Sequence, residues 1–244
     1  MQKYLLWNSE ESSILITRNS KTIHTHKGKI EITQPIEYGD TLFTTKEKKY
    51  YVLNPTNEDV NIKINRKTNT FIIKDLSIIL GYSSLNKNSI VLEIGTGSGA
   101  GTIFLSNFVQ KVISIDINHH NITNAQKNIQ KYGINEDILL ILSNHNTLFF
   151  KENKFDAVII DLPEPEIYAD FCKTVLKNSG DLIFAVPNIE QVKKCREILS
   201  QKKFTYFRTI ETWVRKWLIR TNYSRPFHEM QAHSMFLTFC KKIK

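Results

Sequence analysis

Alternate glycines follow an acidic residue in the sequence Glu-Ile-Gly-Thr-Gly-Ser-Gly, residues 93–99. Glycine lets a backbone turn tightly and approach a ligand closely, because it has no Cβ and tolerates positive φ. A helix predicted to follow the loop would direct free N–H groups and its positive dipole end toward a carboxylate or phosphate. The loop therefore predicts a site for a nucleotide-like cofactor, with these candidate contacts: Glu93, Gly95, Thr96, Gly97, Ser98 and Gly99.

Two kinds of cofactor fit this spacing of glycines. Gly95-x-Gly97-x-x-Ala100 matches the dinucleotide fingerprint, and Asp116 ends the next predicted strand, where a ribose-binding acid is expected. Glu93 favours S-adenosylmethionine over NAD, because a methionine ammonium needs an acceptor and a pyrophosphate does not. The pattern Glu-x-Gly-x-Gly-x-Gly resembles the first motif of class I methyltransferases.

A second acid, Asp161, begins the sequence Asp-Leu-Pro-Glu-Pro at the end of another predicted strand. In open α/β sheets the ligand binds beyond the carboxyl ends of the strands. Glu93, Asp116, Asn144 and Asp161 all lie at or just after such ends, so we expect their side chains to converge on one rim. There Asp116 would bind the ribose hydroxyls. Asn144 would either meet the adenine edge or form an Asx turn.

The elements that must position these residues alternate between strand and helix from residue 75 onward. This alternation predicts a mostly parallel sheet covered by helices on both faces. The predicted strands are residues 90–94, 111–116, 138–143, 155–161 and 182–186. The predicted helices after the loop helix are residues 118–132, 167–176 and 189–201, and a first helix spans 75–80. Two extended runs, 204–220 and 233–240, complete the chain.

Short alternating runs separated by turn signals occupy the first 66 residues and predict a small β domain, a barrel or a sandwich. These runs are residues 13–17, 29–33, 41–44, 50–53 and 61–65. The predicted domains are therefore 1–66, the small β domain, and 67–244, the cofactor-binding domain. His24 and His26 alternate within the first of these, but two histidines without further ligands are a weak metal site, and no metal is expected.

Positive charge is concentrated toward the C-terminal end. The chain has a net charge of +9, while residues 193–244 alone carry 13 Lys+Arg against 3 Asp+Glu. Arg215, Arg220 and Arg225 are interleaved with aromatic residues such as Trp217. Arginine can bind phosphates and aromatic rings can stack on exposed bases, so the segment predicts a nucleic-acid contact. The alternative is a solvated lysine-rich surface.

Several classes of protein are disfavoured by the composition. No apolar run approaches the length of a membrane span, and the N-terminal apolar stretch is too short for a signal peptide. The three cysteines lack metal-ligand spacing. We therefore expect a globular, cytoplasmic protein with reduced thiols and no membrane contact.

Nearly the whole chain, from about residue 22 to 240, resembles the tRNA (adenine-N1)-methyltransferases, especially the archaeal members. The matching segments follow in family order: His24-Thr-His-Lys-Gly28, Tyr50-Tyr-Val-Leu-Asn-Pro-Thr56, the linker Arg66 to Asp75, Asp161-Leu-Pro-Glu-Pro165, Pro187-Asn-Ile-Glu-Gln-Val192, Glu211-Thr-x-x-Arg215, Arg225-Pro226 and His233-Ser-x-Phe236. Three positions depart from the family. Ile72-Ile73 replaces a usual Tyr-Pro, Asn144 replaces an aspartate, and Glu166 stands where tryptophan is common.

The resemblance implies a class I methyltransferase fold with an antiparallel last strand and S-adenosylmethionine as cofactor. The reaction it implies is methylation of N1 of an adenine in the tRNA T-loop, at position 58 and in some archaeal members also at 57. Asp161 would be the catalytic residue, accepting a hydrogen bond from N6–H. Pro163 would contact the substrate beside it, and Arg215, Arg220 and Arg225 would bind tRNA phosphates. The family also implies a homotetramer that grips the tRNA elbow.

Two alternatives remain open from the sequence. The chain could be a class I methyltransferase that acts on a protein or a small molecule. It could also be a non-catalytic tRNA-binding subunit, since eukaryotic relatives pair an active chain with a degenerate one. A degenerate chain should have lost the glycine loop or the strand-end acid, whereas this chain keeps Gly95, Gly97, Gly99 and Asp161.

Overall fold

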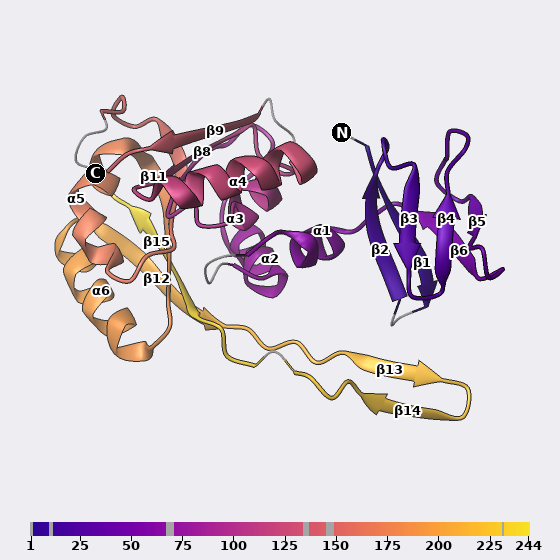
Figure 1. Ribbon diagram of the computed structural model, residues 1–244. Coiled ribbons are helices and arrows are strands. Elements are labelled where there is room, and N and C mark those ends of the chain that lie inside the picture. Colours follow the sequence, from indigo (N-terminus) through magenta and orange to yellow (C-terminus); the bar gives the residue numbers. More distant parts are fainter. Residues whose placement is uncertain (1, 10–11, 67–70, 134–136, 145–148, 231) are drawn as a thin grey trace.

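The computed structural model describes residues 2–9, 12–66, 71–133, 137–144, 149–230 and 232–244. It consists of a large sheet covered by helices, a small all-β part that contains the N-terminus, and a long hairpin that extends away from the large sheet (Figure 1). Among the described helices, none is both long and apolar enough to cross a membrane.

The large sheet has seven strands in the order β12-β15-β11-β10-β7-β8-β9. All neighbours run parallel except at β15, which is antiparallel to both β11 and β12. The strands are β7 (Ile90–Ile94), β8 (Lys111–Asp116), β9 (Ile138–Leu142), β10 (Phe155–Ile160), β11 (Leu176–Val186), β12 (Phe204–Glu211) and β15 (Phe236–Lys242). The predicted class I methyltransferase sheet, with its antiparallel last strand, is confirmed. Its strand order reverses between β7 and β10, where such sheets bind their ligands.

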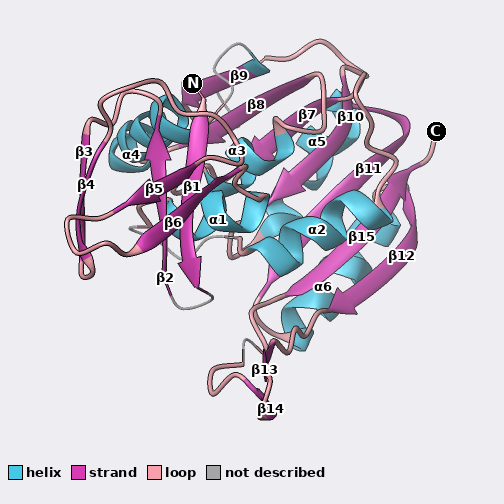
Figure 2. Cartoon of the chain, turned by 90° about the vertical axis from the view of Figure 1, so that its right-hand side faces the viewer, coloured by secondary structure: helices cyan, strands magenta, loops and turns pink. Residues whose placement is uncertain are grey.

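Helices cover both faces of this sheet (Figure 2). They are α2 (Ile73–Tyr82), α3 (Ala100–Leu105), α4 (His119–Tyr132), α5 (Ala169–Val175) and α6 (Ile189–Gln201). Successive strand residues point to opposite faces. In β7, Leu92 and Ile94 pack in the apolar cluster that contains α5 and α6, whereas Val91 packs in the cluster with α2 and α3. Glu93 therefore points toward the α2 and α3 face, although its side chain is an acid.

The ends of α4 and α6 follow capping signals in the sequence. Asn118 accepts a hydrogen bond from the backbone of His120 at the start of α4, and Gly133 ends that helix with its N–H on the carbonyl of Ile129. Asn188 caps α6 in the same way, through the backbone N–H of Gln191. Both predicted helices are confirmed, because Asn is a strong N-cap.

The small N-terminal part is antiparallel. It has a sheet in the order β2-β1-β6-β5 and a separate two-stranded ribbon, β3-β4. Its strands are β1 (Lys3–Ser9), β2 (Ser12–Thr17), β3 (Thr22–Thr25), β4 (Gly28–Glu31), β5 (Thr41–Phe43) and β6 (Lys49–Leu53). Leu6, Ile30 and Tyr50 are buried at its centre, so this part has a core of its own. The predicted small β domain is confirmed as an all-β region.

The predicted run at residues 61–65 is wrong as a strand, because these residues lie in and after a helix, α1 (Asn57–Lys63). Thr56 accepts a hydrogen bond from the backbone N–H of Asp59, and the Asp59 carboxylate accepts one from the backbone N–H of Thr56. This reciprocal capping box specifies a helix start. The two isoleucines at alternate positions, Ile62 and Ile64, suggested a strand, but tertiary packing and the cap favour the helix.

Helix α1 lies between the two parts of the molecule (Figure 1). Its buried Val60 shares an apolar cluster with Ala100 and Ile103 of α3, and Leu15 of β2 packs against the same cluster. The predicted domain boundary between residues 66 and 67 stays a prediction. The linker residues 67–70 lie outside the described residues.

Two C-terminal predictions need correction. The helix predicted at 167–176 begins with a 3-10 turn, Pro165–Tyr168, and continues as α5 only to Val175, because β11 starts at Leu176 rather than at 182. The run 204–220 is two strands, since β12 ends at Glu211 and β13 (Trp217–Arg220) pairs instead with β14 (Tyr223–Pro226). We call residues 212–230, which carry this hairpin away from the body, the arm (Figures 1 and 2).

Candidate active site

The glycine loop and the strand-end acid meet at the point where the strand order reverses. Ile94, the last residue of β7, pairs with Ile160 on one side and Ile115 on the other. The next residue, Gly95, donates its N–H to the carbonyl of Ile115 (2.9 Å), and Asp161 donates its N–H to the carbonyl of Ile94 (3.0 Å). A Cβ on Gly95 would lie 2.6 Å from the backbone oxygen of Asp161. The two motifs are therefore in direct contact.

The loop keeps its shape through positive backbone angles and two hydrogen bonds. Gly95, Gly97 and Gly99 have φ values of 98°, 52° and 79°. The N–H of Gly97 donates to Asp116 Oδ2 (3.0 Å), and the N–H of Gly99 donates to the carbonyl of Thr96 (2.8 Å). Helix α3, which follows, has only six residues. The conformation of this loop, which we call the cradle, therefore depends on the three glycines more than on the N-terminus of α3.

Thr96 and Ser98 were predicted as cofactor contacts, and the structure places their side chains beneath the loop. Both residues are buried, and Thr96 Oγ1 lies 2.7 Å from Ser114 Oγ. The backbone carbonyl of Ser98 accepts a hydrogen bond from Asn128 Nδ2 (2.9 Å). The Thr96 hydroxyl therefore contacts β8 beneath the loop, whereas the buried Ser98 hydroxyl has no hydrogen-bond partner among the described residues. The contact of either residue with a cofactor stays a prediction.

Glu93 is also beneath the loop, with 1% of its surface exposed. Its Oε2 accepts hydrogen bonds from the hydroxyls of Thr102 and Ser114. A Cβ on Gly101 would overlap Glu93 Oε1, so the glycine at 101 makes room for this carboxyl. The structure thus buries the Glu93 carboxyl against Thr102 and Ser114. Its contact with a ligand ammonium, expected from the sequence, stays a prediction.

Burial raises the pKa of Glu93 to about 7, although its two hydroxyl partners act in the opposite direction. The negative charges of Asp161 and Asp116 raise this pKa further. Asp116 and Asp161 are thus close enough to Glu93 to affect its pKa. The sequence predicted that these acids would converge on one rim, because they lie at or just after the carboxyl ends of strands.

This pKa has a consequence for stability. Between the ordinary value of 4.5 and about 7, the folded chain keeps a proton on Glu93 that the unfolded chain has lost. Stability should therefore fall as the pH rises through this window. We expect Glu93→Gln to unfold in urea with a smaller loss of stability between pH 5 and pH 8 than the unsubstituted chain. Glu37→Gln, at an exposed position, is the control, and equal losses in all three proteins would contradict the prediction.

A cavity of about 210 Å³ opens beside the loop. Its lining includes Gly95, Asp116, Ile117, Ser143, Leu162, Pro163 and Tyr168. Asp116 is held in its wall, since Oδ1 accepts from the backbone of Asn118 (2.8 Å) and Oδ2 accepts from Asn121 Nδ2 (3.1 Å). A carboxylate fixed in this way next to the glycine loop fits a ribose.

Ile117 is a lining residue that sequence reasoning missed. It is 75% exposed, directly after the strand-end acid Asp116. An apolar side chain left exposed in a strand-to-helix turn at the cavity edge fits the flat face of an adenine. The sequence does show an isoleucine between Asp116 and the N-cap Asn118. Hydrophobic periodicity, however, assigns roles only to residues within strands and helices, so it says nothing about a residue in this turn.

Asn144 is exposed and is not among the residues that line the cavity, whereas its neighbour Ser143 is. The hydroxyl of Ser143 donates to the backbone carbonyl of Asn144 (3.1 Å). Residues 145–148 lie outside the described residues, so the contact of Asn144 with an adenine edge stays a prediction. Pro163 lines the cavity as expected, and its carbonyl accepts from Gln191 Nε2 (3.2 Å).

Asp161 is half-buried at the end of β10. Burial raises the pKa of its carboxyl to about 7, and the negative charge of Asp75 raises it further. A carboxyl with a pKa near neutrality can both lose and take up a proton under ordinary conditions. Perturbed acids of this kind cluster at functional sites. Asp161 is not itself among the residues that line the cavity, although the next residue, Leu162, is. It is the best candidate at this rim for a group that handles a proton.

The predicted phosphate-binding arginines lie on the arm, whose strands β13 and β14 extend away from the large sheet (Figure 1). Arg215 and Arg220 are exposed and Arg225 is partly exposed. The guanidinium of Arg220 lies 5.9 Å from the ring centre of Tyr223, and Trp217 is also exposed nearby on β13. The arm thus presents arginines and aromatic rings together, as the sequence predicted.

The residues of the rim fit S-adenosylmethionine. Gly95 lines the cavity and lies against the backbone of Asp161, and Asp116 is fixed in the adjoining cavity wall. The apolar Ile117 and Leu162 line the same cavity and suit an adenine ring. Among the described residues, no group of three or more His, Cys, Asp or Glu side chains could hold a metal ion.

This chain resembles known methyltransferases. Residues 48–225 match the family model described as the tRNA methyltransferase complex GCD14 subunit. The tRNA (adenine(57)-N(1)/adenine(58)-N(1))-methyltransferase TrmI of Methanocaldococcus jannaschii is 28% identical over an alignment of 265 positions. The alignment covers 97% of this chain and 94% of that protein.

Two solved structures extend this likeness to the fold. The tRNA (m1A58) methyltransferase TrmI of Aquifex aeolicus superimposes with a TM-score of 0.85 at 26% identity, covering 100% of this chain and 97% of that one. A SAM-dependent O-methyltransferase of Thermotoga maritima gives a TM-score of 0.88 at 25% identity, covering 100% and 93%. All three relatives are similar to this chain over nearly its whole length.

Proposed function

The chain belongs to the family of the tRNA methyltransferase complex GCD14 subunit, and from this premise we propose that it methylates N1 of an adenine in the tRNA T-loop with S-adenosylmethionine. The observation that carries the proposal is the contact between the glycine loop and Asp161, which joins a cofactor cradle to an acid. The acceptor we propose is adenine 58. Position 57, which the name of the Methanocaldococcus jannaschii relative includes, is the second candidate.

S-adenosylmethionine, when bound, supplies an electrophilic methyl group. The backbone of Gly95, Gly97 and Gly99 would hold its amino-acid end, and Asp116 would accept hydrogen bonds from its ribose hydroxyls. Ile117 would cover its adenine. Glu93 supports this site from beneath by fixing Thr102 and Ser114 under the loop.

The task of the chain's own residues is to place the target adenine. N1 of adenine has a lone pair and needs no covalent activation, so catalysis depends on orientation and on exclusion of water. N1 is hidden in paired or stacked RNA, so the base must be drawn out into the cleft. The Asp161 carboxylate would accept a hydrogen bond from N6–H, which fixes the base. It would also stabilise the positive charge that the ring gains on methylation.

A methyltransferase with another acceptor is the second candidate, because the Thermotoga maritima neighbour is named an O-methyltransferase. A thermal-shift assay with S-adenosylmethionine and with NAD tests the cofactor first, and we expect stabilisation by S-adenosylmethionine alone. Incubation of the protein with labelled cofactor, bulk tRNA and a cell-free protein extract tests the acceptor. Label in the tRNA fraction supports the proposal, whereas label confined to protein would contradict it.

A non-catalytic subunit is the third possibility, since the family description names a complex. Such a subunit would bind tRNA but would not need an intact cofactor cradle. Gly95, Gly97 and Gly99 all adopt the positive φ values of the cradle, which supports a catalytic chain. Methyl transfer by the purified chain alone would decide between the two.

The arm is the surface that we propose contacts tRNA phosphates. If Arg215, Arg220 and Arg225 each bind one phosphate, the triple replacement by Gln should reduce the slope of log affinity against log salt concentration by roughly two to three. The control removes the same charge elsewhere, at Lys193 within α6 and at Lys202 and Lys203 directly after that helix. Equal slopes in the two triple variants, measured by filter binding, would contradict a special role for the arm.

We further propose that the chain is cytoplasmic and assembles as a homotetramer. The full-length similarity to the TrmI relatives and the large exposed apolar side chains of the arm, among them Trp213, Trp217 and Ile219, support assembly. Sedimentation equilibrium of the purified chain tests it.

A further inference from the structure

The root of the arm lies between two separate sheets. The ladder between β12 and β15 ends with Glu211 opposite Phe236. The hairpin β13-β14 forms a sheet of its own, which begins with Trp217 opposite Pro226. A cavity of about 670 Å³ lies beside the root, between residues of the arm and helices α1 and α2. The arm is thus neither a continuation of the large sheet nor closely packed on it, and its direction depends on side-chain contacts at its root.

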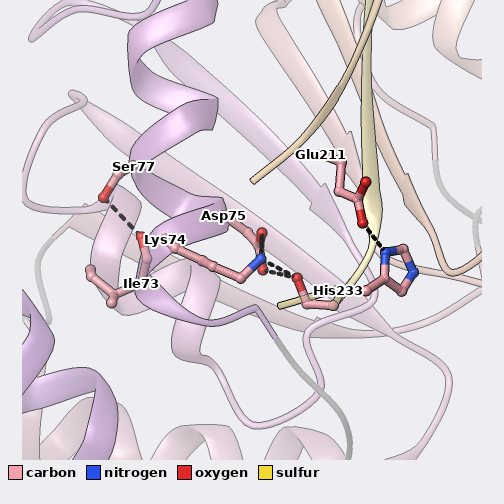
Figure 3. A network of polar contacts seen from close by, with 7 residues as sticks. Ile73, Lys74, Asp75, Ser77, Glu211 and His233 are labelled. Carbon is pink, nitrogen blue, oxygen red and sulfur yellow. Dashed lines mark hydrogen bonds and ion pairs between the residues drawn. The ribbon is translucent and has the colours of Figure 1, made fainter. Parts of the chain in front are cut away.

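One histidine makes such contacts on every side of its ring. His233 Nδ1 lies 2.7 Å from Glu211 Oε1 (Figure 3), and His233 Nε2 lies 2.7 Å from the carbonyl oxygen of Pro187. The centre of the same ring is 4.9 Å from that of Phe236. Glu211 ends β12, Pro187 directly follows β11 and Phe236 begins β15. His233 therefore joins the arm root to the ends of three neighbouring strands of the large sheet.

The two polar partners of His233 determine its protonation state. A carbonyl oxygen and an ionised carboxylate both accept hydrogen bonds and cannot donate them. Both ring nitrogens must therefore carry a proton, which makes the ring an imidazolium. The hydrogen bond with Glu211 raises the pKa of His233, and the one with the carbonyl of Pro187 raises it further. The same contact with His233 lowers the pKa of Glu211, which favours the ionised carboxylate.

A second charged side chain, Lys74 of α2, acts on His233 in the opposite direction and lowers its pKa. Lys74 Nζ lies 2.8 Å from Asp75 Oδ1, and the hydroxyl of Ser234 donates to Asp75 Oδ2 (2.8 Å). Figure 3 shows this cluster beside the histidine. Because the buried carboxylate of Asp75 offsets the charge of Lys74, the effect of Glu211 on His233 is the larger one.

The same histidine is linked to the wall of the cofactor cavity. Pro187, whose carbonyl it contacts, is followed by Asn188, which caps α6 by accepting from the backbone N–H of Gln191 (2.9 Å). The side chain of Gln191 donates through Nε2 to the carbonyl of Pro163 (3.2 Å), and Pro163 lines the cavity. The contact of His233 therefore anchors the arm to the segment that also supports the cleft.

We propose that His233 is a positioning residue that, as an imidazolium, fixes the arm against the rim for tRNA binding and releases it on losing a proton. We call His233, Glu211 and the carbonyl of Pro187 the latch. The inference rests on the proposed function, in which the arm contacts tRNA. On release, one ring N–H bond breaks, its electron pair stays on the nitrogen and the proton goes to water. A neutral ring has one N–H left, so it keeps only one of its two partners.

The latch is suited to opening under mild conditions. The side chains of His233 and Glu211 are both partly exposed, so water and salt screen their attraction. Since the folded-state pKa of His233 is raised above its ordinary value of 6.5, the latch is closed below that pH. It opens as the pH rises through the folded-state pKa. The arm should therefore be fixed in mildly acidic solution and free to change direction in alkaline solution.

NMR titration of the histidine ring tests the protonation state directly. In a chain labelled with ¹⁵N at histidine, the His233 signals are assigned as those that His233→Gln removes. We expect both ring nitrogens to be protonated at about pH 6, and a midpoint above 6.5. Glu211→Gln should lower this midpoint, because it removes the negative partner. Asp170→Asn, which removes an exposed acid on α5, should leave it in place.

A distance measurement tests whether the latch sets the direction of the arm. Spin labels are attached at Asn222→Cys, in the exposed turn of the hairpin, and at Glu197→Cys, exposed on α6, since the three native cysteines are buried. The labelled chain is mixed with an excess of unlabelled chain, so that distances within one chain dominate. We expect a narrow distance distribution at about pH 6 and a broad one at about pH 9. His233→Gln should give the broad distribution at both.

Binding of tRNA should follow the state of the latch. Its affinity, measured by filter binding, should fall by about 3- to 10-fold between about pH 6 and pH 9, because coupling of one pKa unit corresponds to a tenfold change. His233→Gln should show a smaller fall. This variant keeps Asp161 and Glu93, whose pKa values of about 7 lie in the same range, so the difference between the two proteins belongs to His233.

A His233 midpoint at or below 6.5, or one that Glu211→Gln does not lower, would overturn the inference. So would identical distance distributions on both sides of the midpoint, or an equal fall of tRNA affinity in His233→Gln. The NMR and distance measurements need neither tRNA nor activity. A chain that shows the latch but neither binds nor methylates tRNA would overturn the proposed function, and the protonation-dependent movement of the arm would still stand.

Discussion

Asp161→Asn should lower the rate of methyl transfer to tRNA by about 10²- to 10⁴-fold, the range expected when a positioned acid–base group is lost. Asparagine has nearly the same shape as aspartate, but its amide cannot take up a proton. It can also turn an NH₂ group toward N6–H, which then repels the base. Binding of S-adenosylmethionine should remain largely intact, because the proposed cofactor site consists of the glycine loop and Asp116. Single-turnover kinetics and calorimetry measure the two quantities separately.

The matched control is Asp170→Asn, an exposed acid on α5 whose carboxylate pairs with Lys202. Its turnover should stay within about 2-fold of the unsubstituted chain, because surface charges far from the reacting atoms contribute little. Urea unfolding of both variants shows whether the fold is intact. If Asp161→Asn keeps its fold and its turnover is unchanged, the result would contradict the role proposed for this carboxyl.

Gly95→Ala should weaken binding of S-adenosylmethionine by at least about 10-fold and destabilise the fold by about 1–3 kcal/mol, as expected for a side chain in a sparsely populated backbone conformation. Gly95 has a φ of 98°, and the added Cβ would lie 2.6 Å from the backbone oxygen of Asp161. Because that neighbour is backbone, the loop or the end of β10 must shift. Either shift would move the glycine loop away from Asp161.

Gly81→Ala is the control for this substitution. Gly81 lies in α2, and a Cβ there would meet no atom within 4 Å. Alanine in a helix is more favourable than glycine, so this variant should be as stable as the unsubstituted chain or more stable by up to about 1 kcal/mol. If the two variants bind the cofactor equally well, the contact between Gly95 and Asp161 does not contribute to cofactor binding. Isothermal titration calorimetry gives both values of Kd.

Much of the fold could be predicted because the sequence marks it locally. Strand β8 and helix α6 have the predicted bounds, since apolar runs end in clear capping or turn residues. The meeting of the glycine loop with Asp161 could also be predicted, because carboxyl ends of parallel strands share one edge. Helix α1 was misread, although Thr56 and Asp59 carry the capping-box signal, because alternate isoleucines suggested a strand.

Other features depend on contacts between distant segments, which spacing does not reveal. Glu93 faces α3 because Gly101 leaves room for its carboxyl, and nothing within the motif distinguishes that place from the open side of the loop. The buried link between Asp75 and Ser234 joins residues that are 159 positions apart. The end of β12 at Glu211 was missed because β13 continues the same alternating pattern with a different partner.

One measurement tests most directly whether this chain places a methyl group on N1 of a T-loop adenine. An unmodified tRNA transcript is incubated with the purified chain and labelled S-adenosylmethionine, digested with nucleases and mapped by mass spectrometry. A second transcript carries guanine at position 58. We predict 1-methyladenosine in the T-loop fragment of the first transcript, at position 58, and loss of most or all of it in the second. No methylated nucleoside in either transcript, or a methyl group on another base or another atom of adenine, would contradict the account.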